Sequence, residues 1–107
     1  MRHLVATIVV AAVCATAFCT SSRASDTTSN RAVICKVFGR YCQQALRVAW
    51  CESRHHTWAR NGQYLGLFQM GSSERRIYGH GPGPLAQARA AWRYFAASGY
   101  DWSPWSC

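Results

Sequence analysis

The stretch of sequence that decides the fold runs from Trp50 to Met70 and reads WCESRHHTWARNGQYLGLFQM. Apolar residues lead into it at helical rather than alternating spacing, which predicts a helix over residues 43–52. Downstream, Asn61-Gly62 is a strong turn signal, and residues 63–70 can pair across it as a short hairpin. The stretch therefore predicts a helix that ends at an acidic residue, followed by a small hairpin.

Glu52 is one of four acidic residues in the chain and stands where the helical pattern ends. It falls one turn beyond Val48, on the face that the helix would bury. The negative end of a helix dipole and nearby apolar surface both disfavour an ionised carboxylate. We therefore expect Glu52 to hold its proton tightly, as a general acid for glycoside cleavage must. The simpler interpretation is a surface glutamate at a helix end.

The residues around Glu52 resemble two related groups of wall-cleaving enzymes. Glu52-Ser53 and the segment from Gly66 to Met70 are similar to the Glu-Ser and Gly-Leu-Met-Gln pair of soluble lytic transglycosylases, members of the lysozyme superfamily. The likeness is closer to the resuscitation-promoting factors, small secreted domains of actinobacteria in which a cysteine directly precedes the catalytic glutamate. It covers residues 35–107 and is carried by Cys51-Glu52, Trp58, Asn61-Gly62, Tyr64, Gly66, Gln69 and the closing Trp102-Ser103-Pro104-Trp105-Ser106-Cys107.

The resemblance implies a predominantly helical (α+β), lysozyme-like domain with a minor β-hairpin. It implies that Glu52 protonates the β-1,4 bond between N-acetylmuramic acid and N-acetylglucosamine of peptidoglycan. Glu52 then acts as base while the muramyl 6-hydroxyl closes an anhydro ring, which is lytic transglycosylation. No metal or organic cofactor is implied.

The resemblance also implies that Tyr64 and Gln69 contact the glycan, and Asn61 belongs to the same expected binding set. Gly66 would let a sugar chain or another backbone come close, because it has no side chain. Alternatively, Tyr64 is a core aromatic and Gln69 a turn residue that bonds the backbone. For Phe68 we expect the core position.

A muramidase that hydrolyses the same bond is the alternative reaction, and it needs a second carboxylate. Asp101 is the candidate, because a disulfide at the C-terminus would bring it near Glu52. Glu74 is expected in an exposed helix that Ser72 caps and that runs through Tyr78. A peptidoglycan-binding domain without activity and a cationic antimicrobial domain are the remaining alternatives.

Two other segments shape the expected site. His55 and His56 lie in a run, residues 54–57, that departs from both families, and we expect both to be exposed loop residues. Pro84 opens the clearest helix, and Gly99 supplies its stop. The apolar residues of that helix, expected in the core, are Leu85, Ala88, Trp92 and Phe95, and the pair Trp102 and Trp105 would pack near the acid and keep it dry.

The N-terminus has the features of an export signal. A short basic head precedes fifteen uncharged residues, from Leu4 to Phe18, too few for the about 20 that span a bilayer. We expect residues 1–24 to be a removed signal peptide, residues 25–34 a flexible leader and residues 35–107 the domain. A retained anchor, or lipid attachment at Cys14 or Cys19, is the alternative.

Charge then indicates the partners of the secreted chain. Without Arg2 and Arg23, ten basic residues remain against four acidic ones, a net charge of +6. Such a domain is drawn to polyanions, and for an exported protein these are envelope polymers. The expected partners are peptidoglycan glycan strands in the cell wall and, as further candidates, other wall hydrolases. We expect a monomer, no nucleic-acid partner and no stable membrane insertion after signal removal.

Four cysteines remain after signal removal, Cys35, Cys42, Cys51 and Cys107, and an even number in an oxidising compartment predicts two disulfides. On one helix Cys42 and Cys51 would lie about 13.5 Å apart, beyond the roughly 7 Å that a disulfide spans. Two sets of pairings remain open. The family resemblance implies Cys51–Cys107 and with it Cys35–Cys42. No Cys-x-x-Cys or His-x-x-x-His spacing indicates a metal site.

Overall fold

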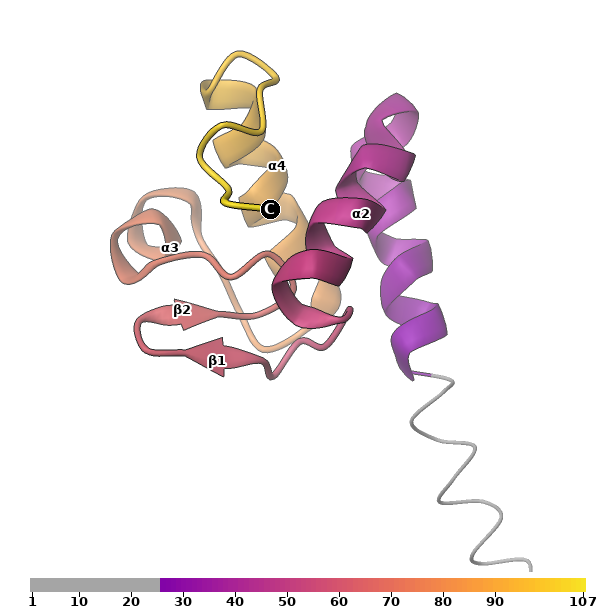
Figure 1. The fold of residues 1–107 in the computed structure, drawn as a ribbon, viewed down its shortest axis with the longest axis horizontal. Helices are drawn as coiled ribbons and strands as arrows, with labels where there is room; N and C mark the ends of the chain where they lie inside the picture. The colour runs from indigo at the N-terminus through magenta and orange to yellow at the C-terminus, as the bar shows by residue number, and fades with distance from the viewer. Residues whose placement is uncertain (1–25) are drawn as a thin grey trace, which may run out of the picture.

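The computed structural model describes residues 26–107, which form one mainly helical domain (Figure 1). The expected signal peptide and the cysteines within it lie outside the described residues. An N-terminal helix over residues 26–38 is followed by a 3-10 turn, η1 (Gly39–Tyr41). The remaining elements are α2 (Cys42–Ser53), β1 (Arg60–Asn61), β2 (Tyr64–Leu65), α3 (Ser72–Tyr78) and α4 (Pro84–Ala97). The predicted helical class with a minor hairpin is confirmed.

The N-terminal helix corrects the prediction of a flexible leader over residues 25–34. Residues 26–38 are helical, and Asn30, Ile34 and Phe38 form one buried stripe at four-residue spacing. The Asn30 side chain donates a hydrogen bond of 3.0 Å to the carbonyl oxygen of His55. The polar run therefore belongs to the domain, because one amide has a buried partner that lies 25 residues along the chain.

Helix α2 lies between the N-terminal helix and the rest of the domain (Figure 1). Its inner face buries Ala45, Val48 and Ala49, and the helix ends at Arg54, whose φ of 54° is left-handed. The backbone N–H of Arg54 donates to the Trp50 carbonyl. This end of α2 points toward the hairpin and carries Glu52 with it.

The β-hairpin is the predicted one. Strands β1 and β2 are antiparallel, with Arg60 opposite Leu65 and Asn61 opposite Tyr64, so the turn is Gly62-Gln63. Leu65 also forms a bridge with Met70, which folds the following loop back onto the hairpin. The hairpin and this loop form the side of the domain opposite the N-terminal helix (Figure 1).

Two disulfides staple the domain, with the pairing that the resemblance implied. Cys35–Cys42 joins the N-terminal helix to the start of α2, and Cys51–Cys107 joins the end of α2 to the C-terminus. Disulfides persist in oxidising compartments, which indicates a location such as the outside of the cell. Within the described residues, no helix has the length and apolar character needed to cross a membrane.

The core lies between the N-terminal helix, α2, α4 and the loop after the hairpin. Phe68 is 1% exposed, as expected for a core aromatic. In α4, Ala88 and Phe95 are buried as predicted, but Leu85 is 40% exposed because it lies in the first turn, beyond the reach of the core. Ser72 is the first residue of α3 rather than its cap, which is Gly71. The core residues are Ile34, Phe38, Ala45, Val48, Ala49, Leu67, Phe68, Met70, Ala90, Ala91, Phe95 and Trp105.

Candidate active site

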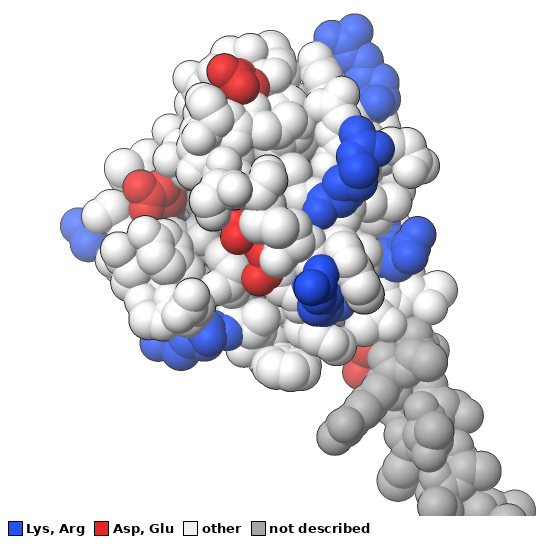
Figure 2. Space-filling view, in the orientation of Figure 1, with Lys and Arg blue, Asp and Glu red and all other residues white. Residues whose placement is uncertain are grey.

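An open cavity of about 460 Å³ lies where the end of α2, the hairpin, the start of α3 and the C-terminal segment meet. Its lining combines carboxyl groups, side-chain amides and aromatic rings. The lining residues are Glu52, Asn61, Gln63, Tyr64, Gln69, Met70, Gly71, Ser73, Glu74, Tyr94, Pro104, Trp105 and Ser106. On the face shown in Figure 2, basic side chains lie along the right and at the lower left, and acidic side chains are spread from the top and the left edge to the middle.

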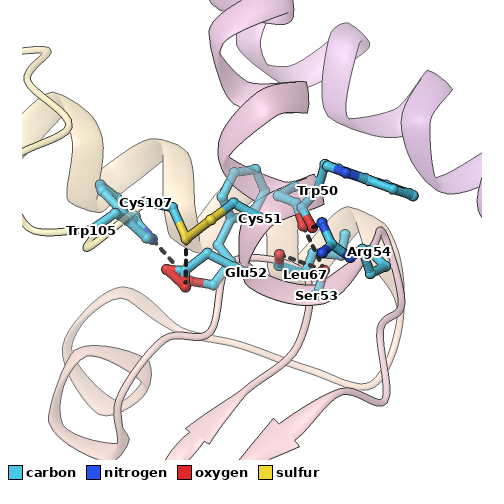
Figure 3. Close-up of a disulfide and its surroundings, with 10 residues drawn as sticks. Trp50, Cys51, Glu52, Ser53, Arg54, Leu67, Trp105 and Cys107 are labelled. Carbon is cyan, nitrogen blue, oxygen red and sulfur yellow. Dashed lines mark hydrogen bonds between the residues drawn. A yellow bond between two sulfur atoms is a disulfide. The ribbon is translucent and has the colours of Figure 1, made fainter.

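Glu52 lies in this cavity at the end of α2 (Figure 3). It is half-buried, and burial raises the pKa of its carboxyl because the charged form loses contact with water. Its Oε1 lies 3.5 Å from the sulfur of Cys107. A disulfide sulfur has no hydrogen to donate but is a weak acceptor, so this contact suits a protonated carboxyl. Burial therefore favours the protonated form of a carboxyl that lies at a solvent-accessible surface.

Ser53, the residue after Glu52, anchors the end of α2 to the loop that follows the hairpin. Ser53 is buried, and its hydroxyl lies 2.8 Å from the Leu67 carbonyl oxygen and 3.0 Å from that of Ala49 (Figure 3). The hydroxyl thus links the last turn of α2 to the loop that follows the hairpin. This link sets the position of Glu52 relative to Gln69, two residues beyond Leu67.

The C-terminal segment covers the other side of Glu52. The Cys51–Cys107 bond holds the chain end beside the acid, and the Trp105 ring nitrogen donates a hydrogen bond of 2.9 Å to the Phe68 carbonyl. Trp105 lines the cavity and is 8% exposed, as expected for a residue that keeps the acid dry. Trp102 does not line the cavity and packs instead on Phe95, with ring centroids 4.2 Å apart.

Three residues of the expected glycan-binding set line the cavity, Asn61, Tyr64 and Gln69. Tyr64 is 46% exposed and is not a core aromatic. Gln69 has a left-handed φ of 46°, and its amide nitrogen donates to the carbonyls of Ala59 and Gly66, at 2.9 and 3.1 Å. These two bonds use both amide hydrogens of Gln69. Only its Oε1 is therefore left to accept a hydrogen bond from a sugar.

Gly66, at which we expected a sugar chain or another backbone to come close, is buried and is not among the residues that line the cavity. What comes close is the buried side chain of Gln87, whose Oε1 would lie 2.5 Å from a Cβ at position 66. Gln87 accepts a hydrogen bond from the Leu67 N–H and donates to the carbonyls of Thr57 and Gly81. Gln87 thus connects α4 to both loops that flank the hairpin. The helical pattern around Gln87 in the sequence did not predict this role.

Asp101 and Glu74 exchange the positions that the sequence predicted for them. Asp101 is exposed, does not line the cavity, and accepts a hydrogen bond of 3.1 Å from the Ser103 N–H in a turn. Glu74, expected on an exposed helix, is half-buried and lines the cavity with Glu52. The hydrophobic pattern of α3 gave no sign of this, because the position of Glu74 follows from how α3 packs on the hairpin.

His55 is also wrongly predicted, because it is 4% exposed rather than in open solvent. Its Nε2 lies 2.9 Å from the Leu46 carbonyl oxygen, which can only accept, so this nitrogen carries the hydrogen. Burial, and next the nearby Arg31 and His56 charges, lower the pKa of His55, and the Leu46 hydrogen bond opposes them. His56 is half-buried and stacks on Trp58, with ring centroids 4.7 Å apart.

Within residues 26–107, no group of three or more histidine, cysteine, aspartate or glutamate side chains is arranged to hold a metal ion. Comparisons of the chain with protein-family models, curated proteins and solved structures find no match.

Proposed function

We propose that the protein cleaves the β-1,4 bond between N-acetylmuramic acid and N-acetylglucosamine in peptidoglycan, with Glu52 as the general acid. The observation that carries this proposal is the half-buried Glu52 carboxyl, whose pKa is raised by burial, inside a cavity open to solvent. A general acid for this bond must keep its proton near neutral pH and still reach the bridging oxygen. The raised pKa of Glu52 supports the first requirement, and its place in an open cavity supports the second.

The lining of the cavity supports a sugar ligand. Aromatic rings on opposite sides, Tyr64 on the hairpin and Tyr94 on α4, offer apolar faces against which sugar rings can pack. The amides of Asn61, Gln63 and Gln69 supply hydrogen-bonding groups for hydroxyl and acetamido substituents. An apolar wall with a few converging polar groups is the usual construction of a small-ligand site.

The sequence resemblance points to the same substrate. Four of the residues that carry it, Glu52, Asn61, Tyr64 and Gln69, line the same cavity although they lie up to 17 positions apart in the chain. The net positive charge expected for the exported chain favours the anionic envelope in which peptidoglycan lies. We accordingly propose secretion to the cell wall as the location.

The first step of the reaction is the same whether the acceptor is the muramyl 6-hydroxyl or water. Glu52 donates its proton to the bridging oxygen as the bond from this oxygen to the muramyl C1 breaks, and positive charge develops at C1. The muramyl 6-hydroxyl then closes an anhydro ring, as the resemblance implies, or water attacks C1. The ionised Glu52 can accept the proton of the 6-hydroxyl in the first case.

Mass spectrometry of fragments released from purified peptidoglycan tests this proposal. The protein with both disulfides formed is compared with Glu52→Gln, which removes the proton but keeps the shape, and with Asp101→Asn as a matched control outside the cavity. We expect fragment release to fall about 10²-fold or more in Glu52→Gln and to persist in Asp101→Asn. If the unmodified protein binds sacculi but releases no fragments, the proposed catalysis is wrong and the protein is a wall-binding domain.

A further inference from the structure

We infer that Glu74 is the second carboxylate of this cavity and that it activates water, so that the protein hydrolyses the glycosidic bond. This inference rests on the proposed function of Glu52 and goes beyond it by naming the acceptor and the base. It also replaces Asp101, which the fold keeps outside the cavity.

Glu74 reaches the cavity because position 71 has no side chain. A Cβ built on Gly71 would lie 2.6 Å from Oε2 of Glu74, 3.4 Å from Oε1 of Gln63 and 3.5 Å from the Tyr64 ring. The Glu74 carboxylate therefore lies directly over the backbone of Gly71, beside the hairpin residues proposed to hold the sugar. Gly71 is buried, so this approach is part of the packed structure.

The turn that carries Glu74 is fixed to the hairpin by its neighbour. The guanidinium of Arg75 donates hydrogen bonds to the Gln63 and Met70 carbonyl oxygens, at 2.6 and 2.5 Å. The Ser72 hydroxyl and N–H also approach Oε1 of Gln63, at 3.1 and 3.4 Å. These contacts hold the first turn of α3 against β2, so Glu74 keeps its place relative to Tyr64.

The opposite wall connects the two carboxyl groups. Tyr94 lines the cavity together with Glu74, and burial first, then the charge of Glu74, raises the pKa of the Tyr94 hydroxyl. The Tyr94 ring lies 5.0 Å from the ring of Trp105, whose segment ends at the sulfur that contacts Glu52. Glu52 and Glu74 thus both line one open cavity, whose volume of about 460 Å³ has room for a sugar and a water.

The chemistry balances with these two groups alone. Glu52 donates a proton to the bridging oxygen as the C1–O bond breaks, which releases the next sugar as an alcohol. Water forms the new bond to C1, and Glu74 accepts the proton that this water loses. The product has a free reducing end, and solvent exchange returns a proton to Glu52 and removes one from Glu74.

Digestion of purified peptidoglycan in ¹⁸O-labelled water tests the inference. We expect muramyl reducing ends that carry ¹⁸O from the unmodified protein, and a loss of about 10²-fold or more in Glu74→Gln. Asp101→Asn, which removes the same charge outside the cavity, should keep the full rate. Formate added to Glu74→Ala should restore part of the rate, because a small carboxylate can occupy the vacated space, and this rescue requires a folded site.

Different results would contradict the role of Glu74 and the proposed function of the protein. Anhydro-muramyl products alone, or ¹⁸O-labelled products at an unchanged rate in Glu74→Gln, would overturn the role of Glu74 and leave Glu52 as the acid of a lytic transglycosylase. Activity that survives in Glu52→Gln, or no release by the unmodified protein, would overturn the proposed function and this inference with it. Loss in Glu74→Ala without formate rescue, in a protein of unchanged near-ultraviolet circular dichroism, would assign Glu74 to binding instead.

Discussion

Oε1 of Glu52 lies 3.5 Å from the sulfur of Cys107, which is bonded to Cys51, the residue before the acid. The disulfide thus returns the far end of the chain to the carboxyl and covers one side of it. Because the sulfur carries no positive charge and no hydrogen, it removes water without compensating an anion. The loss of water therefore raises the free energy of the ionised form of Glu52 relative to the protonated form.

Glu52→Gln should therefore stabilise the protein at neutral pH. Burial raises the folded-state pKa of Glu52, so the folded state binds its proton more tightly than the unfolded chain does. The stability lost as the pH rises through this raised pKa is regained by a neutral amide of the same shape. We expect the gain to shrink as the pH falls below the ordinary glutamate pKa, where both states are protonated.

Urea unfolding of both proteins across a pH series measures this gain. Asp101→Asn is the matched control, because Asp101 is exposed and lies outside the cavity. Equal free energies of unfolding for Glu52→Gln and the unmodified protein at every pH would contradict a raised pKa for Glu52.

The two disulfides should contribute unequally to stability. Cys51–Cys107 joins residues 56 positions apart and Cys35–Cys42 joins residues 7 apart. Chain entropy assigns about 4 kcal/mol to the longer loop and about 2.5 kcal/mol to the shorter one. Thermal and urea unfolding of the double alanine variants measure both costs. Only the loss of Cys51–Cys107 should also abolish glycan cleavage, since it frees the segment that carries Trp105. If the two variants lost the same amount of stability, or the same amount of activity, this account would be contradicted.

Local sequence signals predicted the elements well. The Asn61-Gly62 signal, Pro84 at the start of α4 and Gly99 after its end act within a few residues, and the hairpin, with its turn at Gly62-Gln63, and α4 follow them. The burial of Phe68 follows from the usual core position of an aromatic ring, whereas Tyr64 and Gln69 were placed in the site by the resemblance and not by a local pattern.

Contacts between distant segments could not be predicted in this way. The N-terminal helix is held by the bond from Asn30 to the His55 carbonyl, and Gln87 bonds to loops 20 and 30 positions away. A polar residue in a single sequence carries no sign of such a partner, so Asn30 and His55 were both predicted to be exposed. Glu74 was misplaced because its surroundings depend on how Arg75 fixes α3 to the hairpin.

Gly66→Ala should destabilise the protein more than Gly62→Ala. Both glycines have left-handed φ values, 86° and 60°, so both alanines are strained by about 1–2 kcal/mol. At position 66 the new Cβ would also lie 2.5 Å from Oε1 of Gln87, whereas at position 62 nothing lies within 4 Å. The clash displaces the acceptor of the Leu67 N–H, and a buried unpaired N–H costs about 1–3 kcal/mol more.

Chemical denaturation of the two alanine variants measures this difference. Gly62→Ala controls for backbone strain alone, since it lies in the exposed turn of the same hairpin. We expect Gly66→Ala alone to lose hydrogen-exchange protection at the Leu67 amide. Similar midpoints for both variants would mean that Gln87 moves aside freely and that its hydrogen bonds do not hold the hairpin loops.

His55 should make the protein less stable in mild acid. Burial lowers its folded-state pKa, so between this value and the ordinary pKa of about 6.5 the unfolded chain binds a proton that the folded protein does not. The free energy of unfolding must then rise with pH in that window and fall as the pH drops below about 6.5. His80, whose pKa is lowered by burial and by Arg75, adds a change of the same sign.

The slope of stability against pH, rather than stability itself, isolates this effect. His55→Asn loses the hydrogen bond to the Leu46 carbonyl and should be weaker at every pH, but its curve should be flatter between pH 5 and 7. His80→Asn should flatten the curve separately, and the double variant should combine both changes because the two imidazoles lie in different parts of the fold. An unchanged slope in His55→Asn would show that the fold accepts a charged His55 and would contradict a lowered pKa for this residue.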